Sequence, residues 1–142
     1  MDVCTRLEDA ISLAALLVCI MRMLYRLRLN NQRWRTYSPM LVHENRWRAM
    51  RYSFDEGLID FAKGRIVPFE TLLNEILDLT YEDMRALGCE SEVTSVKNIL
   101  SRGTSAHRQL NAHELSVTAG NSQQEALNAV VDTLIADTAE GL

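Results

Sequence analysis

Apolar residues recur at helical spacing along most of the chain, and capping patterns mark where helices begin. Thr5 and Glu8 have the spacing of a capping box and predict a helix from Arg6 to about Asn30. Almost every residue from 10 to 20 is apolar, which predicts a helix buried on every side. Further helices are predicted over residues 39–54, 69–77, 81–87, 91–102, 105–115 and from 123 onward.

One short segment has the pattern of a β-hairpin. Residues 58–61 and 65–67 are mostly apolar and flank Gly64, which suits the left-handed position of a tight turn. The pattern therefore predicts a mainly α fold with one short β-hairpin. The length of 142 residues is typical of one domain, so residues 1–142 are expected to form a single region.

The composition favours a protein of the cytoplasm. Hydrophobic residues make up 47% and charged residues 24%, which is ordinary for a soluble domain. The most apolar stretch, residues 10–21, ends at Arg22 and is expected to be too short to span a bilayer. A signal peptide is not expected either, because acidic residues stand where its basic residues would be. Three cysteines without close spacing fit a reducing compartment. We therefore expect a cytoplasmic location and no membrane partner.

Charge is distributed unevenly along the chain. Residues 22–51 contain eight arginines and a single acid, Glu44, whereas residues 52–142 contain fifteen acids and six bases. The planar guanidinium of arginine suits phosphate and carboxylate ligands. Alternatively, the arginines reflect codon usage and pair with the acidic half. The net charge of −4 and the absence of a binding motif disfavour nucleic acid as a partner.

The helix predicted after Pro39 carries a candidate anion site. Glu44, Arg48 and Arg51 fall within about 60° of one another on a helix, and Asn45 flanks them. They lie beside an apolar face formed by Met40, Trp47, Met50 and Phe54. The strip is either a solvated salt-bridge face or a partly buried site for an anion.

Other chemical motifs are sparse. The chain has no phosphate-binding glycine loop and no nucleophile elbow. His43, His107 and His113 lack the spacing of metal ligands. Cys89 beside Gly88 is either a reactive thiol or, more simply, a small residue at a helix end.

Three segments nevertheless resemble a known family. MDVCTRLEDA at the start is similar to the stretch that follows the E-x-R core of a strand in the YbdK-type carboxylate–amine ligases, a branch of the glutamate–cysteine ligase superfamily (family 2). ENRWRAMRY at residues 44–52 resembles the family's N-x-x-x-A-x-R-Y-G segment, with Ser53 in place of the glycine. GTSAHRQL at residues 103–110 resembles its G-T-S-A-x-R-Q segment.

The resemblance implies that the chain is the C-terminal portion of an α+β, glutamine-synthetase-like fold. By resemblance, the family uses ATP and Mg²⁺ to activate the carboxylate of glutamate as an acyl phosphate, which an amine such as that of cysteine attacks. Small amino-acid substrates are thus implied, with the metal ligands in the part outside this chain. Arg51 is the expected phosphate or carboxylate contact, assisted by Asn45 and Arg48, with Arg108 and Gln109 as weaker candidates.

A truncated chain would be catalytically incomplete. The alternative is a stand-alone helical interaction module without catalysis. In either case the first helix, without its partner sheet, is expected to expose apolar surface and to favour self-association into a homo-oligomer.

Overall fold

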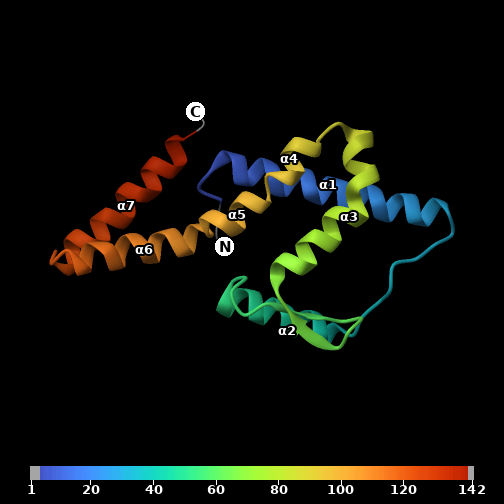
Figure 1. Ribbon diagram of the computed structural model, residues 1–142, viewed down its shortest axis with the longest axis horizontal. Helices are drawn as coiled ribbons and strands as arrows, with labels where there is room; N and C mark the ends of the chain where they lie inside the picture. The colour runs from blue at the N-terminus through green and yellow to red at the C-terminus, as the bar shows by residue number, and fades with distance from the viewer. Residues whose placement is uncertain (1–3, 141–142) are drawn as a thin grey trace. The chain divides into compact units, whose positions relative to one another are not determined.

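The computed structural model describes residues 4–140, which form a mainly helical structure with one small sheet (Figure 1). The helices are α1 (Leu7–Leu29), α2 (Pro39–Tyr52), α3 (Phe69–Leu87), α4 (Glu90–Thr94), α5 (Lys97–Arg102), α6 (Ser105–Thr118) and α7 (Gln123–Ala139). The strands are β1 (Leu58–Asp60) and β2 (Arg65–Val67), paired antiparallel with Ile59 opposite Ile66. The predicted mainly α fold with one hairpin is confirmed.

The chain divides into two compact units. The first comprises residues 1–16 and 91–142, and the second comprises residues 17–90. The boundary falls inside α1, which therefore contributes its first half to one unit and its second half to the other.

The second unit is built around α1, α3 and the hairpin. Its buried apolar residues are Cys19, Met23, Val67, Leu73, Leu77 and Met84. The hairpin turns at Gly64, whose φ of 64° is the left-handed conformation predicted from the sequence. Helix α3 ends in a Schellman-type cap, where Gly88 is left-handed and the Cys89 N–H donates to the carbonyl of Met84.

The first unit contains the helical hairpin of α6 and α7, which pack against each other (Figure 1). Both helices begin with capping boxes: Thr104 pairs with His107, and Ser122 pairs with Glu125 as predicted. The helix predicted from Arg6 begins at Leu7, where the side chain of Thr5 contacts Asp137 and that of Glu8 contacts Arg102.

Two predicted helix boundaries were wrong. The segments 69–77 and 81–87 form the single helix α3, because residues 78–80 include neither glycine nor proline and continue the helix. Conversely, residues 91–102 are interrupted at Ser95, whose hydroxyl donates to the carbonyl of Glu92. This local bond competes with the helical pattern and separates α4 from α5.

Burial of α1 differs most from expectation. Its buried residues form one stripe with alternating spacings of three and four: Asp9, Ser12, Leu16, Cys19 and Met23. The opposite side is open, with Leu17 61% and Met21 70% exposed. The predicted burial on every side is therefore wrong within the described residues, whereas the predicted exposure of apolar surface is confirmed.

The length of α1 also exceeds the apolar stretch identified in the sequence. Its 23 residues contain an 18-residue window apolar enough to cross a membrane by length and composition, with 22% of that window buried. The expectation of a stretch too short to span a bilayer is therefore corrected, because Arg22 lies inside the helix and does not end it. A core helix has the same length and composition, so the absence of a membrane partner stays a prediction.

Candidate functional site

The predicted site lies on α2 and the β-hairpin of the second unit. Asn45 reaches the first strand through both ends of its amide: Nδ2 donates to the carbonyl of Ile59 at 2.9 Å, and the Ile59 N–H donates to Oδ1 at 2.7 Å. The side chain thereby pairs with the strand as a neighbouring strand would. Asn45 fixes α2 to the hairpin.

Arg48 makes the second connection between the same elements. Its Nε donates to the carbonyl of Gly57 at 3.3 Å, and Nη2 donates to the carbonyl of Glu56 at 3.0 Å. The guanidinium carbon also lies 5.8 Å from the centre of the Tyr52 ring. These carbonyls belong to the turn before β1, so Arg48 holds the position of that turn.

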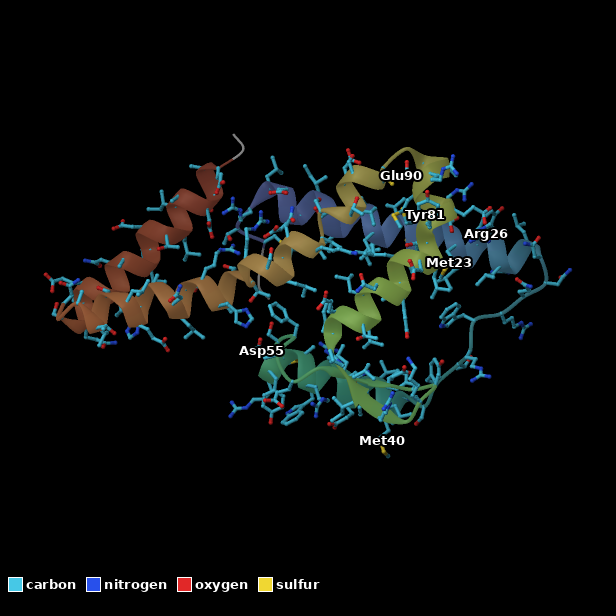
Figure 2. All side chains as sticks on the ribbon, viewed as in Figure 1. Met23, Arg26, Met40, Asp55, Tyr81 and Glu90 are labelled. Carbon is cyan, nitrogen blue, oxygen red and sulfur yellow. The ribbon has the colours of Figure 1, made fainter. Side chains whose placement is uncertain are left out.

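Arg51, the third predicted residue, is exposed at the last turn of α2. Glu44 is exposed as well, and no residue of α2 is buried. Among the residues that the structure describes, Arg51 has no ion-pair partner. Arg51 therefore lies at an open surface, next to the exposed side chains of Met40, Trp47 and Met50 (Figure 2 labels Met40), and the anion site stays a prediction.

The two weaker candidates have structural roles in the first unit. Arg108 donates to the carboxylate of Asp137 at 2.9 Å and to the carbonyl of Gly103 at 2.8 Å. Gln109 donates to the hydroxyl of Ser105 at 3.0 Å. The interpretation of these two side chains as helix-end and salt-bridge contacts is confirmed.

A buried ion cluster in the second unit was missed by the sequence reasoning. Asp83 on α3 is fully buried and forms ion pairs with Arg22 and Arg26 of α1, the latter at 2.9 Å (Figure 2 labels Arg26). Burial raises the pKa of the Asp83 carboxyl, but hydrogen bonds from Arg26 and Arg22 outweigh it, and the net pKa is below its ordinary value. The spacing of Arg22 and Arg26 by four residues is the one signal that indicated a shared face.

Two cysteines far apart in the sequence also meet in this unit. The sulfur of Cys19 on α1 lies 3.5 Å from that of Cys89 after α3, and both are free thiols. Burial, with a further contribution from the hydrogen bond with Cys89, raises the pKa of the Cys19 thiol to about 11. A thiol in that state is a poor nucleophile, which favours a packing role for Cys19. The raised pKa of Cys19 does not decide whether Cys89 is a reactive thiol or a small residue at a helix end.

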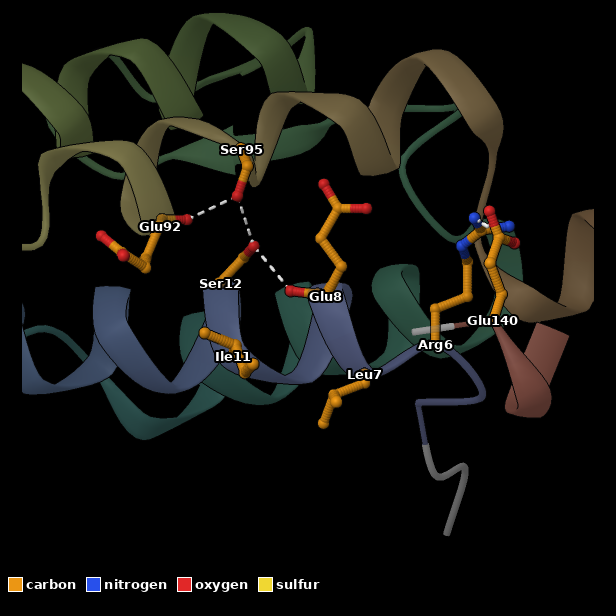
Figure 3. A pocket seen from close by; sticks show the side chains of 8 residues that line it. All are labelled: Arg6, Leu7, Glu8, Ile11, Ser12, Glu92, Ser95 and Glu140. Atoms are coloured by element: carbon orange, nitrogen blue, oxygen red, sulfur yellow. Dashed lines mark hydrogen bonds and ion pairs between the residues drawn. The ribbon is translucent and has the colours of Figure 1, made fainter. Parts of the chain in front are cut away.

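The first unit contains a cavity of about 310 Å³ that includes none of the predicted residues (Figure 3). Its lining residues are Arg6, Leu7, Glu8, Ile11, Ser12, Glu92, Ser95 and Glu140. The Ser12 hydroxyl lies 2.6 Å from that of Ser95 and donates to the Glu8 carbonyl at 2.8 Å. The charged side chains have partners within the protein: Arg6 pairs with Asp137 and with Glu140, which also lines the cavity, and Glu8 pairs with Arg102. We therefore assign no ligand to this cavity.

Comparison with known proteins assigns the chain to a family. Residues 1–133 match glutamate–cysteine ligase family 2 (GCS2). The chain belongs to that family. It is 54% identical over 137 residues to a protein of Rhodospirillum rubrum named "Putative glutamate–cysteine ligase 2", covering 96% of this chain and 35% of the relative. Proteins of the same name from Jannaschia sp. and Paracoccus denitrificans are 48% and 44% identical, covering 96% and 94% of this chain and 36% of each relative.

The resemblance drawn from the three sequence segments is thereby confirmed at the level of the family. The chain spans about a third of the length of these glutamate–cysteine ligase family 2 relatives, so it corresponds to a portion of the family protein. No solved structure matches the chain. The glutamine-synthetase-like fold therefore stays a prediction.

The Mg²⁺ that the resemblance implies has no candidate group of ligands in the part of the chain that the structure describes. Within residues 4–140, no three His, Cys, Asp or Glu side chains are grouped so that they could hold a metal ion. We therefore assign no chemical step to Mg²⁺ through the residues of this chain.

Proposed function

We propose that this chain is part of an ATP-dependent carboxylate–amine ligase that joins glutamate to an amine such as that of cysteine. The observation that carries the proposal is membership of glutamate–cysteine ligase family 2 over residues 1–133. When bound, ATP would supply the phosphoryl group that converts the acid into an acyl phosphate, the electrophile in amide formation.

The contribution of this chain is the α2 surface next to the hairpin. Arg51 binds a phosphoryl group or a substrate carboxylate, because its guanidinium is exposed and offers the forked donor pattern that suits such anions. Asn45 and Arg48 position it by holding α2 on the hairpin through the carbonyls of Ile59, Gly57 and Glu56. A fixed cation next to a transferring phosphoryl group stabilises the negative charge of the transition state.

The direct test is a chimera of the Rhodospirillum rubrum relative in which this chain replaces the matched region. We expect ADP release that depends on both glutamate and cysteine. Arg51→Ala should lower turnover by at least about 100-fold, as loss of one transition-state donor does in other enzymes. Arg46→Ala is the matched control, because Arg46 is exposed on the same helix about 140° away. Unchanged turnover of Arg51→Ala would remove this residue from the site.

The second candidate function is a helical interaction module without catalysis. It is favoured by the hydrogen bonds of Asn45 and Arg48, which are satisfied within the protein. Calorimetric titration of the folded chain with Mg·ATP separates the two candidates. Binding supports a share in the nucleotide site, whereas a chain that is helical by circular dichroism and does not bind favours the module.

A further inference from the structure

The side of α1 that faces away from α3 carries an unusual amount of exposed apolar surface. We define the outer face of α1 as Leu17, Val18, Met21, Leu24 and Tyr25, all in the second unit. Their side chains are between 42% and 70% exposed. At 100° per residue they fall within an arc of about 120°, opposite Cys19 and Met23, which are buried.

Between residues 17 and 26 the charged side chains are Arg22 and Arg26, which point toward Asp83 at the margin of the buried stripe and leave the outer face without charge. The exposed Arg28 lies on the same side of the helix beyond Tyr25, so the apolar face ends there. A solvent-facing helix surface is normally polar, and a helix apolar all round is one that is buried all round. The outer face thus has the composition of a core surface without a cover in this chain.

The family comparison indicates what covers it. The relatives are almost three times as long as the region that this chain matches, since the chain covers 34–36% of each. A large part of the family fold therefore lies outside these 142 residues. That part of the fold is available to pack on the apolar side chains that α1 leaves exposed. Large apolar side chains gathered on one face are normally buried in the interior of a fold.

We propose that the outer face of α1 is the docking surface for the part of the family 2 ligase fold that lies outside this chain. That part would contact the outer face through apolar side chains of its own. The proposal rests on family membership and not on the ligase activity proposed above. Packing of that part against Leu17 and Met21 would complete the burial of α1 on both sides.

The first test compares the oxidation of Met21 by hydroxyl radicals in two states of the protein. Met21 is 70% exposed, so it should oxidise readily in the isolated chain. In the chimera with the Rhodospirillum rubrum relative we expect at least a tenfold slower rate, measured by mass spectrometry. Equal oxidation of Met21 in the chimera and in the isolated chain would overturn the proposal. This readout does not depend on catalysis, so an inactive chimera still decides it.

A second test uses two separate polypeptides. The part of the Rhodospirillum rubrum relative outside the matched region is mixed with this chain, and complex formation is measured by light scattering. We expect a one-to-one complex that Met21→Glu weakens by at least 100-fold, because the new charge would be buried without a partner. Met40→Glu is the matched control, since Met40 is 78% exposed on α2 and lies outside the face.

Two results would assign the face to another occupant and overturn the proposal. A homodimer that Met21→Glu dissociates, without a complex between the two polypeptides, would show that a second copy covers it. Flotation of the chain with phosphatidylglycerol vesicles, abolished by Met21→Glu and not by Met40→Glu, would show that lipid covers it. Circular dichroism of each variant verifies that the helices are retained.

Discussion

The two units of the protein bury different kinds of residue. Among the described residues, the buried apolar side chains of the first unit are Leu16, Val93, Val96 and Ala126, and its buried polar ones are Asp9, Ser12, Ser116 and Asp137. The second unit buries six apolar residues against three polar ones, which are Asp60, Thr80 and Asp83. The first unit therefore depends more on hydrogen bonds and ion pairs, and the second on a packed core.

The difference is also visible in how each unit holds a carboxylate. Asp83 in the second unit is completely buried, and both of its arginine partners come from α1. Asp137 in the first unit is also buried, although 10% of its side chain is exposed, and it joins Arg6, before α1, to Arg108 on α6. The burial differs on the arginine side as well, because Arg22 and Arg26 are 38% and 31% exposed, whereas Arg6 and Arg108 are 15% and 16% exposed. The second unit therefore brings exposed arginines to a buried carboxylate, which depends on their hydrogen bonds for its solvation.

The largest effect is expected from truncating the buried carboxylate. Asp83→Ala should lower the free energy of unfolding by about 3 kcal/mol, because it removes the charged hydrogen bonds from Arg22 and Arg26 to a fully buried carboxylate and leaves a void there. Asp137→Ala should cost less, about 1–2 kcal/mol, since its carboxylate keeps some contact with water. Urea unfolding of each variant measures both values. Asp78→Ala is the control on α3, exposed and expected to stay within about 0.5 kcal/mol.

The pH dependence gives an independent check on Asp83. Its folded pKa lies below its ordinary value of 3.8, so its stabilising contribution is complete above about pH 4 and is lost as the pH falls through the folded pKa. Asp83→Asn should therefore be less stable at pH 7 and lose less stability on acidification. Parallel curves for the variant and the parent chain between pH 7 and pH 3 would contradict this assignment.

The reactivity of the cysteines tests whether the core of the second unit is closed to solvent. Cys4 in the first unit is exposed, whereas Cys19 in the second is buried, and its pKa is raised from 9.0 to about 11. Two pKa units mean about 100-fold less thiolate at pH 8, so iodoacetamide should modify Cys19 at least 100-fold more slowly than Cys4. Mass spectrometry of time points measures both rates. Similar rates would show that the core of the second unit opens readily.

Glycine substitutions compare how tightly the two units pack at turns. A Cβ at Gly57 would lie 2.3 Å from the carbonyl oxygen of Val67, whereas at Gly103 it would lie 2.9 Å from the side chain of His107. The nearest atom at Gly103 is the His107 Cβ, so both contacts are with atoms fixed by the backbone, and the closer one is at Gly57. Gly57→Ala should therefore cost more than about 2 kcal/mol and Gly103→Ala less. Gly64→Ala, also left-handed but in open space, measures the cost of the backbone conformation alone. Thermal unfolding ranks the three variants.

The smallest effect is expected at the helix caps. The Ser122 hydroxyl accepts from the Glu125 N–H in the first unit, whereas Ser38 before α2 makes no side-chain cap bond. Ser122→Ala should therefore cost about 1 kcal/mol and Ser38→Ala much less. A loss at Ser38 equal to that at Ser122 would show that α2 depends on a cap that the structure lacks. Urea midpoints provide the comparison.

Local patterns in the sequence determined most of the secondary structure. Gly64 specifies a turn that needs a left-handed residue, Gly88 ends α3 for the same reason, and Ser122 with Glu125 begins α7. The same kind of local signal carried the family resemblance, because three short segments in order were enough to indicate it. Such features depend on neighbours within about four residues and are therefore readable without a fold.

Only the tertiary structure decided which side chains meet and which faces remain open. No local pattern could show that Asp83 would neutralise Arg22 and Arg26, or that Asn45 and Arg48 would bind the hairpin while Arg51 stayed exposed. The apolar run in α1 correctly predicted a helix, but within the described residues only one side of that helix is buried. Burial depends on the elements that pack against a helix, and a sequence pattern records the preference of the helix without recording whether that partner is present.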